Sequence, residues 1–423
     1  MYRSVNSLFK CPKTLKKLNN CGCFGRYLDD FAEWMARDQF SDFTMGRHIS
    51  NVAHFSHSLK GRDPEINNLD CHIQSFIEHI PTCHCKGWKK PRKIKYVRHS
   101  LNRFKSFLFE CGKIQPKPEG LAYAEIHNEY LVWLSEKFFL KNSSVKLRSS
   151  YLKQFLQWYE DFSKQGDLHA LTANDVEFFF IKATRPWSAA YRRSLQGTLR
   201  SFFDFCHERK HTTRNLRFSL PVIKTYRLSE VPRKIDEKES AKLVSGIERS
   251  GASGKRNYAI LRILDTYGVR GCQLRSLKLK DIDWQKNEIH FPPAKNGKSL
   301  AFPLMAEVGN AILDYLKNAR QKCRRQELFL TLRAPFKPLS HKALSQMIRT
   351  AMLKSDIDSP SRGAHCFRHG FVSRMIEQGE SFKHIADLAG HKHIQTTFIY
   401  TKIDFNSLAE VALELPEVRY ENN

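Results

Sequence analysis

The sequence has no run of apolar residues long enough to cross a lipid bilayer, and no apolar segment of the secretory type follows Met1. Both absences argue against a membrane-embedded or secreted protein, so we expect a cytoplasmic one. The hydrophobic content of 41% is nevertheless high enough to build buried cores. A length of 423 residues allows roughly three domains.

Acidic residues are scarce relative to basic ones. The chain has 43 Asp and Glu residues against 70 Lys and Arg residues, and its formal net charge is +27. A positive field of this size attracts the phosphate backbone of nucleic acids. Because a positive charge attracts RNA and anionic membrane surfaces as well, it shows only that the partner is a polyanion.

Disulfide bonds are not expected among the eleven cysteines, because the cytoplasm is reducing. Six cysteines lie within the first 85 residues, with His72 and His84 alongside: Cys11, Cys21, Cys23, Cys71, Cys83 and Cys85. The C-x-C pairs lack the spacer of two to four residues that is usual in zinc knuckles. We therefore expect reduced thiols and leave a zinc site open. Cys206, Cys272 and Cys366 lie among apolar residues and are expected to pack in cores.

The most informative stretch lies between residues 363 and 404, which read G-A-H-C-F-R-H-G-F and then L-A-G-H-K-H-I-Q-T-T-F-I-Y-T-K-I-D. His365 and Arg368 are three residues apart in a segment with helical apolar periodicity, so a helix would place them on one face. His391 follows an apolar helix, and Tyr400 lies nine residues further on. The spacing predicts a turn between two helices that could hold the tyrosine hydroxyl near the first pair.

These residues resemble the C-terminal signature of the tyrosine recombinases, also called phage integrases, in which H-x-x-R and L-G-H-x(8)-Y carry catalysis. The resemblance implies a second arginine upstream, after a helix and a tight glycine turn, and Arg270 matches it. It also implies a lysine at the tip of a β-hairpin. The alternating segments 288–291 and 300–304 flank Lys295-Asn-Gly-Lys298, and Asn-Gly in such a setting is a strong hairpin signal.

The chemistry implied by the resemblance suits these residue types. A tyrosine can attack phosphorus, hold the cut strand covalently and leave again on religation, and Tyr400 would be that nucleophile. Arg270 and Arg368 would clamp the non-bridging phosphate oxygens, because guanidinium groups bind phosphate bidentately. Lys295 would protonate the departing 5′-oxygen as the general acid, with Lys298 as its rival.

Histidines complete the implied set. His365 would assist proton transfer with the nucleophile, and His391 would hydrogen-bond a non-bridging oxygen. No metal, nucleotide or other cofactor is then expected. Gln273 stands where the family usually has an acidic residue, and an amide cannot fix a neighbouring charge as a carboxylate does. His369 and His393 are expected to be surface or supporting residues.

The resemblance also implies the fold class. We expect a mainly α protein with helical, SAM-like core-binding domains and a mixed α/β catalytic domain that carries a small antiparallel β-hairpin or sheet. An apparent repeat of a helix, a Ser/Thr turn and a second helix begins near Tyr27 and again near Tyr130, which indicates a duplicated core-binding module. The expected parts are a helical extension (1–91), a core-binding DNA clamp (92–220), a linker (221–233) and a catalytic domain with a C-terminal tail (234–423).

The stretch from Tyr191 to Phe205 is rich in arginine and phenylalanine and resembles the last helix of the core-binding domain. Its periodicity predicts an amphipathic helix with the phenylalanines inward and Arg192, Arg193 and Arg200 toward DNA phosphates. Upstream of it, Thr172 is expected to cap a helix.

The leading functional hypothesis is site-specific DNA recombination, in which strands are cleaved and exchanged through a 3′-phosphotyrosine during integration, excision or transposition of a mobile element. The partner would be double-stranded DNA in the nucleoid, with no membrane. Apolar residues between 408 and 415 resemble a tail that docks on the next protomer, giving a homotetramer on paired sites, alone or with sister recombinases; the tail could equally pack within its own chain. Two alternatives stay open: a type IB topoisomerase, and a DNA-binding accessory protein with a weakened site.

Overall fold

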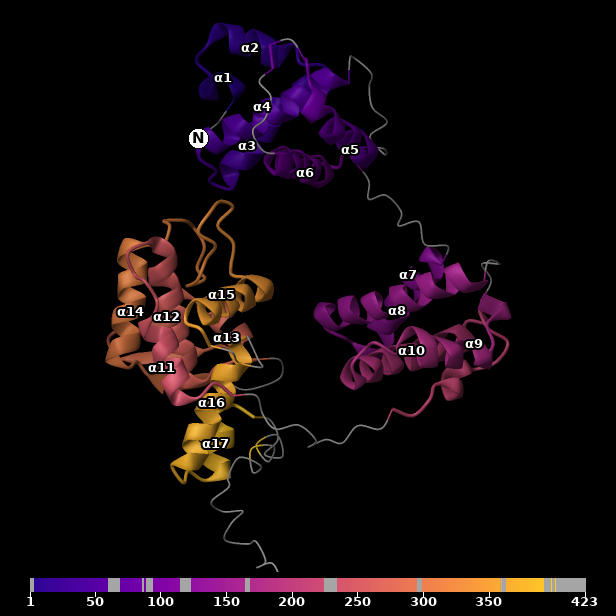
Figure 1. Cartoon of the computed structure of the whole chain (residues 1–423), viewed down its shortest axis with the longest axis vertical. Coiled ribbons are helices and arrows are strands. Elements are labelled where there is room, and N and C mark those ends of the chain that lie inside the picture. Colours follow the sequence, from indigo (N-terminus) through magenta and orange to yellow (C-terminus); the bar gives the residue numbers. More distant parts are fainter. Residues whose placement is uncertain are drawn as a thin grey trace, which may run out of the picture. The chain divides into compact units, whose positions relative to one another are not determined.

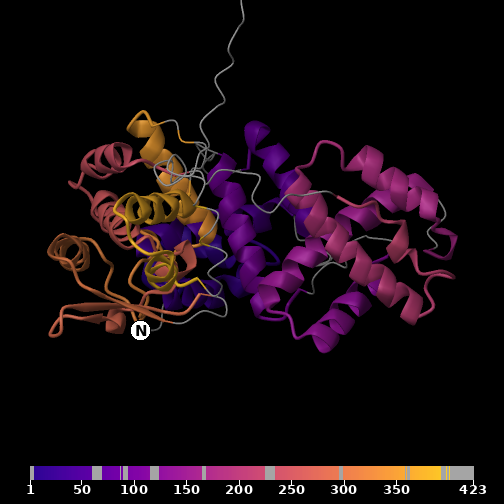
Figure 2. The ribbon, with the colours of Figure 1, turned by 90° about the horizontal axis from the view of Figure 1, so that it is seen from below.

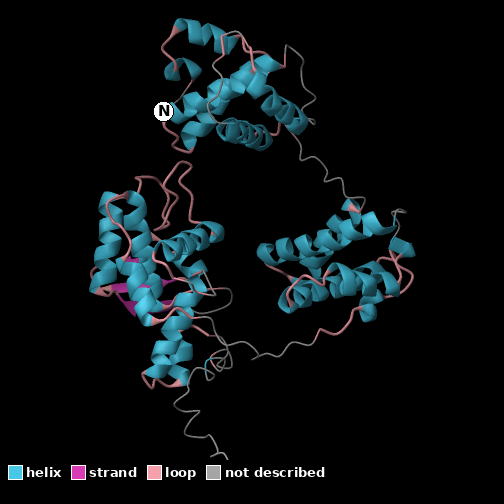
Figure 3. Ribbon diagram, viewed as in Figure 1, coloured by secondary structure: helices cyan, strands magenta, loops and turns pink. Residues whose placement is uncertain are grey.

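The computed structural model of the chain is mainly helical, with three short strands (Figure 1, Figure 3). This confirms the predicted fold class. The residues it describes are 4–59, 69–85, 87–88, 94–114, 123–163, 168–223, 234–294, 299–357, 359, 363–391, 397 and 400. None of the helices formed by these residues is both long and apolar enough to span a membrane.

The N-terminal helices occupy the first 111 residues. They are α1 (Val5–Leu8), α2 (Pro12–Asn19), η1 (Gly25–Tyr27), α3 (Leu28–Arg37), α4 (Asp42–Ser58), α5 (Leu69–His79), η3 (Ile80–Thr82) and α6 (Ile94–Glu110). Ser41 caps α4, because its hydroxyl accepts a hydrogen bond from the Thr44 amide at 3.3 Å. Aromatic rings fill the centre, where Phe104 packs edge-on against Phe24 and Phe31 with centroids 5.3 Å and 5.2 Å away.

Helix α6 belongs with the N-terminal helices. Contacts divide the chain into a unit Gly112–Ser229, called the middle unit below, and a unit that contains Met1–Cys111 and Glu230–Asn423. Helix α6 packs against α3, α4 and α5, and its apolar face is buried there. The division of the chain by contacts therefore follows α6, at Cys111.

The middle unit is a helical bundle. Its elements are α7 (Ala124–Phe138), α8 (Asn142–Ser163), η4 (Leu168–Ala170), α9 (Ala173–Phe178), η5 (Phe179–Ala183), α10 (Ala189–Glu208) and η6 (Leu216–Ser219). As predicted, Thr172 caps α9: its hydroxyl accepts from the Asp175 amide at 3.3 Å, and Asp175 accepts from the Thr172 amide at 2.9 Å. The pairs α3–α4 and α7–α8 are both helix–turn–helix units, in agreement with the repeat in the sequence.

The C-terminal part, residues 234–400, contains all three strands (Figure 3). Its elements are α11 (Glu237–Ser245), α12 (Ala252–Tyr267), α13 (Gly271–Ser276), η7 (Leu279–Asp281), β1 (Ile282–Asp283), β2 (Glu288–Phe291), β3 (Leu300–Pro303), α14 (Ala306–Asn318), α15 (His341–Lys354), α16 (Ala364–Glu377) and α17 (Phe382–Leu388). Helix α12 is the central element and packs against α11, α13, α14 and α16.

The strands form an antiparallel sheet in the order β1-β2-β3. Ile289 pairs with Phe302, and both side chains are buried in the core with Phe291, as the period of two along a strand requires. This confirms the hairpin predicted from the alternating apolar residues. Its turn, with Lys295 and Lys298, lies outside the described residues.

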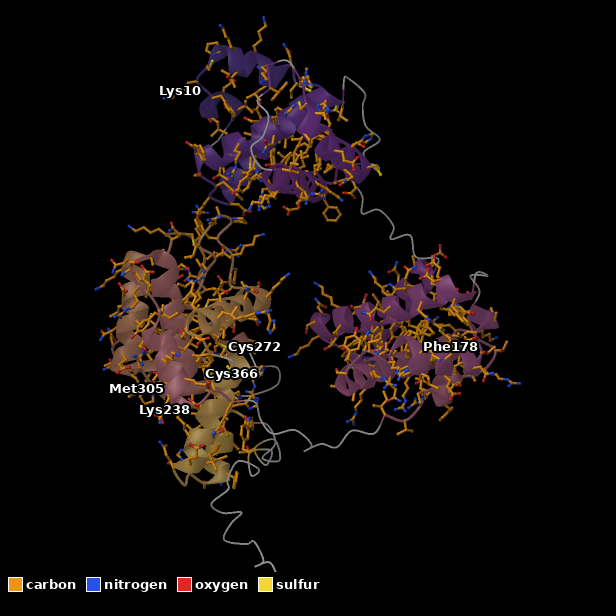
Figure 4. All side chains as sticks on the ribbon, in the orientation of Figure 1. Lys10, Phe178, Lys238, Cys272, Met305 and Cys366 are labelled. Atoms are coloured by element: carbon orange, nitrogen blue, oxygen red, sulfur yellow. The ribbon has the colours of Figure 1, made fainter. Side chains whose placement is uncertain are left out.

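The cysteine predictions are confirmed at two positions and wrong at a third. Cys206 and Cys366 are buried, and Cys272 is exposed. Figure 4 labels Cys272 and Cys366 in the C-terminal part. Cys272 is exposed because α13 directs its next two residues, Gln273 and Leu274, into the core.

Candidate active site

A glycine turn places the first arginine. Helix α12 ends at Gly268, whose φ of +55° is the left-handed conformation that glycine adopts readily. A Cβ on Gly268 would also lie 2.6 Å from the side chain of Phe371 on α16. Two separate features therefore require glycine at position 268: the left-handed backbone conformation and the close approach of α16. Arg270 follows two residues later, at the start of α13.

Gln273 supports this turn through hydrogen bonds. Its side-chain oxygen accepts from the Arg270 amide at 3.2 Å, and its side-chain nitrogen donates to the Pro292 carbonyl at 3.0 Å. The side chain is buried, with both ends of the amide satisfied. The glutamine thus joins the arginine turn to the end of β2 by neutral hydrogen bonds.

The two arginines meet at one backbone carbonyl. Arg368, on α16, donates to the Gly268 carbonyl at 3.1 Å and to the Ala389 carbonyl. Arg270 donates to the Gly390 carbonyl at 3.1 Å and to the Ala389 carbonyl at 3.4 Å. The carbonyls of Ala389 and Gly390 lie at the C-terminal end of α17, which packs against α16 (Figure 1, Figure 2). The negative end of a helix is a favourable place for two cations.

Burial lowers the pKa of both arginines. It lowers the pKa of Arg368 to about 10, with the neighbouring Arg270 charge acting in the same direction. The pKa of Arg270 is lowered mainly by burial as well. Both groups stay charged at neutral pH, and in a site with little water their attraction for an anion is strong.

Tyr400 is buried beside these arginines, and its hydroxyl contacts a histidine. The exposed fraction of Tyr400 is 2%, and its ring packs with Val372, Ile376 and Ile385. Its hydroxyl lies 2.5 Å from Nδ1 of His369 on α16, with the ring centroids 5.5 Å apart. Burial raises the pKa of Tyr400 to about 12, against the lowering effect of the two arginine charges. The tyrosine is therefore a neutral phenol at pH 7.

His369 contacts the Tyr400 hydroxyl, which fits the supporting role expected of it and not a surface position. It is partly buried, and burial, with the charges of His365 and Arg368, lowers its pKa to about 4. A neutral imidazole can accept the proton of the phenol that it contacts. The sequence carries a signal for this role, because His369 lies four residues after His365 and therefore on the same face of α16. His365 itself is exposed, with its ring centroid 6.4 Å from that of His369.

His391 also lies near the arginine pair. Its Nδ1 is 2.8 Å from the hydroxyl oxygen of Thr397, and its amide donates to the Ala386 carbonyl at 2.8 Å. Burial and the charges of Arg368 and Arg270 lower its pKa to about 4. The imidazole is therefore neutral at pH 7. Of the six predicted catalytic residues, the described structure gathers Arg270, Arg368, His391 and Tyr400 around the end of α17.

The predicted DNA contacts of the middle unit lie on α10. Phe202, Phe203 and Phe205 are fully buried, which confirms the inward face of this helix. Arg193 is exposed on it, and Arg200 is partly exposed. Arg192 is partly buried and donates to the Phe180 carbonyl at 3.2 Å, so one of its two terminal nitrogens already has a partner within the bundle.

Comparison with known proteins agrees with this arrangement. Residues 233–407 match the phage integrase family. A protein of Sinorhizobium fredii (strain NBRC 101917 / NGR234) named as an integrase/recombinase, y4rA, is 35% identical over 397 residues, which are 92% of this chain and 94% of that one. This chain belongs to the phage integrase family of tyrosine recombinases. It is therefore an enzyme of site-specific DNA recombination, which cleaves and rejoins DNA strands.

More distant members of the family share sequence or fold with it. The tyrosine recombinase XerD of Listeria innocua serovar 6a is 25% identical over 291 residues, which are 68% of this chain and 97% of that one. A crystal structure of the XerH site-specific recombinase bound to a palindromic difH substrate has a TM-score of 0.55 and 17% identity, covering 82% of this chain and 95% of that one. The XerH likeness concerns the fold.

Proposed function

We propose that the chain recombines specific DNA sites through a covalent 3′-phosphotyrosine on Tyr400. The observation that carries this assignment is the position of the Tyr400 hydroxyl, 2.5 Å from a neutral imidazole and beside two arginines held at one carbonyl. A phenol, a proton acceptor and two cations are what an attack on a phosphodiester requires. The biological context would be integration, excision or transposition of a mobile element.

In the attack, the Tyr400 oxygen forms a bond to phosphorus while the bond to the 5′-oxygen breaks. The charge that grows on the non-bridging oxygens is stabilised by Arg270 and Arg368, which are already partly stripped of water. His391 donates a further hydrogen bond to a non-bridging oxygen. Religation is the same reaction in reverse, with the 5′-hydroxyl as nucleophile and the tyrosine as leaving group.

The protons move at both ends of the reaction. His369 accepts the phenol proton, because it contacts the hydroxyl directly, and His365 assists from one turn away on α16. Lys295 donates a proton to the departing 5′-oxygen, and Lys298 contacts a neighbouring phosphate. This set of groups works without a metal ion or nucleotide, so cleavage should proceed without ATP.

Duplex DNA is the proposed partner, and two features of the chain support it. The net charge of +27 favours a polyanion, and recombinases of similar fold have been solved bound to their DNA sites. We place Arg192, Arg193 and Arg200 of α10 against the phosphate backbone. We further propose that four copies assemble on two paired sites, alone or with sister recombinases, and that the protein works in the cytoplasm at the nucleoid.

The test uses a suicide substrate, a nicked duplex that loses a short fragment on cleavage and so traps the covalent complex. Wild type should give a protein–DNA adduct on a denaturing gel. Tyr400→Phe should bind the same DNA with unchanged affinity and give no adduct, because only the hydroxyl is lost. An adduct of undiminished yield in Tyr400→Phe would place the nucleophile elsewhere.

A second assay separates recombination from type IB topoisomerase activity, which uses the same bond chemistry. Two plasmids that carry the site should yield joined products, and supercoiled DNA without the site should relax slowly or not at all. Rapid relaxation of site-free DNA, with no joint products from paired sites, would favour the topoisomerase.

A further inference from the structure

Two cysteines and two histidines of the N-terminal helices converge in space, and the proposed recombination uses none of them. Nε2 of His54, Sγ of Cys83 and Sγ of Cys85 all lie within 4.8 Å of one another. Nε2 of His54 is 3.4 Å from Sγ of Cys83, and Nε2 of His79 is 3.4 Å from Sγ of Cys85. His54, Cys83 and Cys85 thus form a cluster of metal ligands, and His79 adjoins it through its contact with Cys85.

The distances match those of a metal site. Zinc binds thiolate sulfur at about 2.3 Å and imidazole nitrogen at about 2.0–2.1 Å in a tetrahedron, which separates a sulfur from a nitrogen by about 3.5 Å. Both observed contacts between nitrogen and sulfur are 3.4 Å. Because a hydrogen bond between a thiol and an imidazole has a similar length, it is the convergence of His54, Cys83 and Cys85 within 4.8 Å that marks the site.

The backbone explains how a C-x-C pair can bind one ion. Cys83 ends η3 in an extended conformation, with φ of −63° and ψ of 124°. Alternate residues of an extended segment point to the same side, so Cys83 and Cys85 can both face His54. In a zinc knuckle a turn brings the two thiolates together and needs a longer spacer. The short spacing that made zinc improbable from the sequence alone is compatible with this geometry.

Aromatic side chains contact the His54 ring and fix its orientation. His54 is buried in α4, and the indole of Trp88 stacks on it with centroids 5.2 Å apart and an angle of 3° between the rings. The Phe76 ring meets the other side of the imidazole edge-on at 5.1 Å. One ion would bind both thiolates and both imidazoles in place of their present contacts with one another.

We propose that His54, His79, Cys83 and Cys85 bind one structural Zn²⁺. The ion fastens the segment after η3 to α4 and so stabilises the N-terminal helices. Two thiolates balance the charge of the ion, and two neutral imidazoles complete a closed tetrahedral site with no open position for substrate. The site serves folding and has no part in strand cleavage.

The experiment measures metal on the full-length chain. Protein purified from zinc-supplemented cells without chelator should contain about one zinc per chain by elemental analysis. Cys83→Ser with Cys85→Ser should lose that zinc. The matched control is Cys71→Ser with Cys111→Ser, two exposed cysteines of the same helices, which should keep it. Equal loss in both pairs, or no zinc in wild type, would overturn the proposal.

Cobalt spectroscopy keeps the test decisive if the serine pair fails to fold. Wild type refolded with Co²⁺ should show the visible bands of a tetrahedral ion and a thiolate charge-transfer band. Cys83→His keeps four ligands, so it should retain the visible bands and lose about half of the charge-transfer intensity, since one of two thiolates remains. A Co²⁺ spectrum that is unchanged in Cys83→His would show that Cys83 is not a ligand.

Discussion

The C-terminal part and the N-terminal helices both gather reactive side chains, and they do so by different means. In the C-terminal part, Arg270 and Arg368 are anchored to backbone carbonyls at the end of α17. In the N-terminal helices, His54 and Cys83 contact each other directly. A side chain that is hydrogen-bonded to the main chain depends on one particular turn, so its position in the sequence relative to that turn is fixed. Side chains that contact only one another can lie at any sequence separation that the packing of the helices allows.

The largest expected effect is a loss of cleavage rate when either of the two arginines that are hydrogen-bonded to backbone carbonyls is replaced. Arg270→Ala and Arg368→Ala should each slow cleavage of the suicide substrate roughly a hundredfold or more, because each removes a donor to the transition state. Arg349→Ala, an exposed arginine on α15, is the control and should cleave at the wild-type rate. If either active-site variant cleaves at nearly the normal rate, that arginine is not part of the clamp.

The next test concerns the general acid on the hairpin. Lys295→Ala should be slow on ordinary DNA, roughly a hundredfold, and largely restored on DNA with a 5′-bridging phosphorothiolate, because sulfur leaves without a proton. Lys298→Ala should instead weaken binding and reduce the slope of log affinity against log salt by about one unit. Rescue of Lys298→Ala by the sulfur substrate, with Lys295→Ala still slow, would exchange the two roles.

A smaller kinetic effect is expected at His369, which contacts the nucleophile. His369→Phe removes the proton acceptor and should lower the cleavage rate roughly tenfold or more. His369→Asn places an amide oxygen near the position of Nδ1, so it should hold the hydroxyl and recover part of the rate with an altered pH profile. A normal cleavage rate in His369→Phe, together with a slow rate in His365→Phe, would show that His365 and not His369 accepts the proton.

The glycine turn gives an effect on stability. Gly268→Ala should destabilise the C-terminal part by about 2 kcal/mol or more, since it forces a side chain into a left-handed backbone and against Phe371. Gly251→Ala is the matched control at the other end of α12, where φ is −116° and no atom lies within 4 Å of the added Cβ. Chemical denaturation should separate the two variants. Equal midpoints would mean that the turn tolerates a side chain.

The smallest effect expected is a pH dependence of the N-terminal helices. Burial, with Arg103, His99 and Arg47, lowers the pKa of His48 to about 3, against about 6.5 in an unfolded chain. As pH falls below 6.5 the unfolded state takes up this proton first, so stability is lost between pH 6.5 and about 3. The loss from one histidine is at most about 1.4 kcal/mol per pH unit.

His48→Asn should therefore flatten the fall in unfolding free energy between pH 7 and pH 5. His57→Asn, at an exposed position on the same helix α4, should leave the slope unchanged. Urea denaturation at the two pH values measures both. A slope that is the same in His48→Asn and wild type would show that another group titrates in this range.

Local signals were sufficient to predict much of the C-terminal part from sequence. Alternating apolar residues around Asn-Gly predicted β2 and β3, because strand periodicity and turn chemistry act over a few residues. The glycine before Arg270 predicted the turn that places this arginine. The spacing from His391 to Tyr400 indicated that the tyrosine lies near the arginine pair.

What the sequence could not supply depends on tertiary contacts. His369 contacts Tyr400, which lies 31 positions later in the chain. The position of His369 next to Arg368 in the sequence does not predict this contact. Cys272 lies among apolar residues, yet α13 turns it outward. His54 and Cys83 come from segments 29 positions apart, and only the packing of α4 against α5 brings them together.

The shared carbonyl of Ala389 has a consequence for mutagenesis. The group that both arginines contact is a main-chain oxygen, so replacing the alanine side chain by serine or glycine leaves it in place. Its role becomes visible only when the main chain itself is altered. Replacing Gly390 by glycolic acid turns the amide after Ala389 into an ester, whose carbonyl is a weaker acceptor. Both guanidinium groups would then lose part of their anchor, although every side chain in the protein would be unchanged.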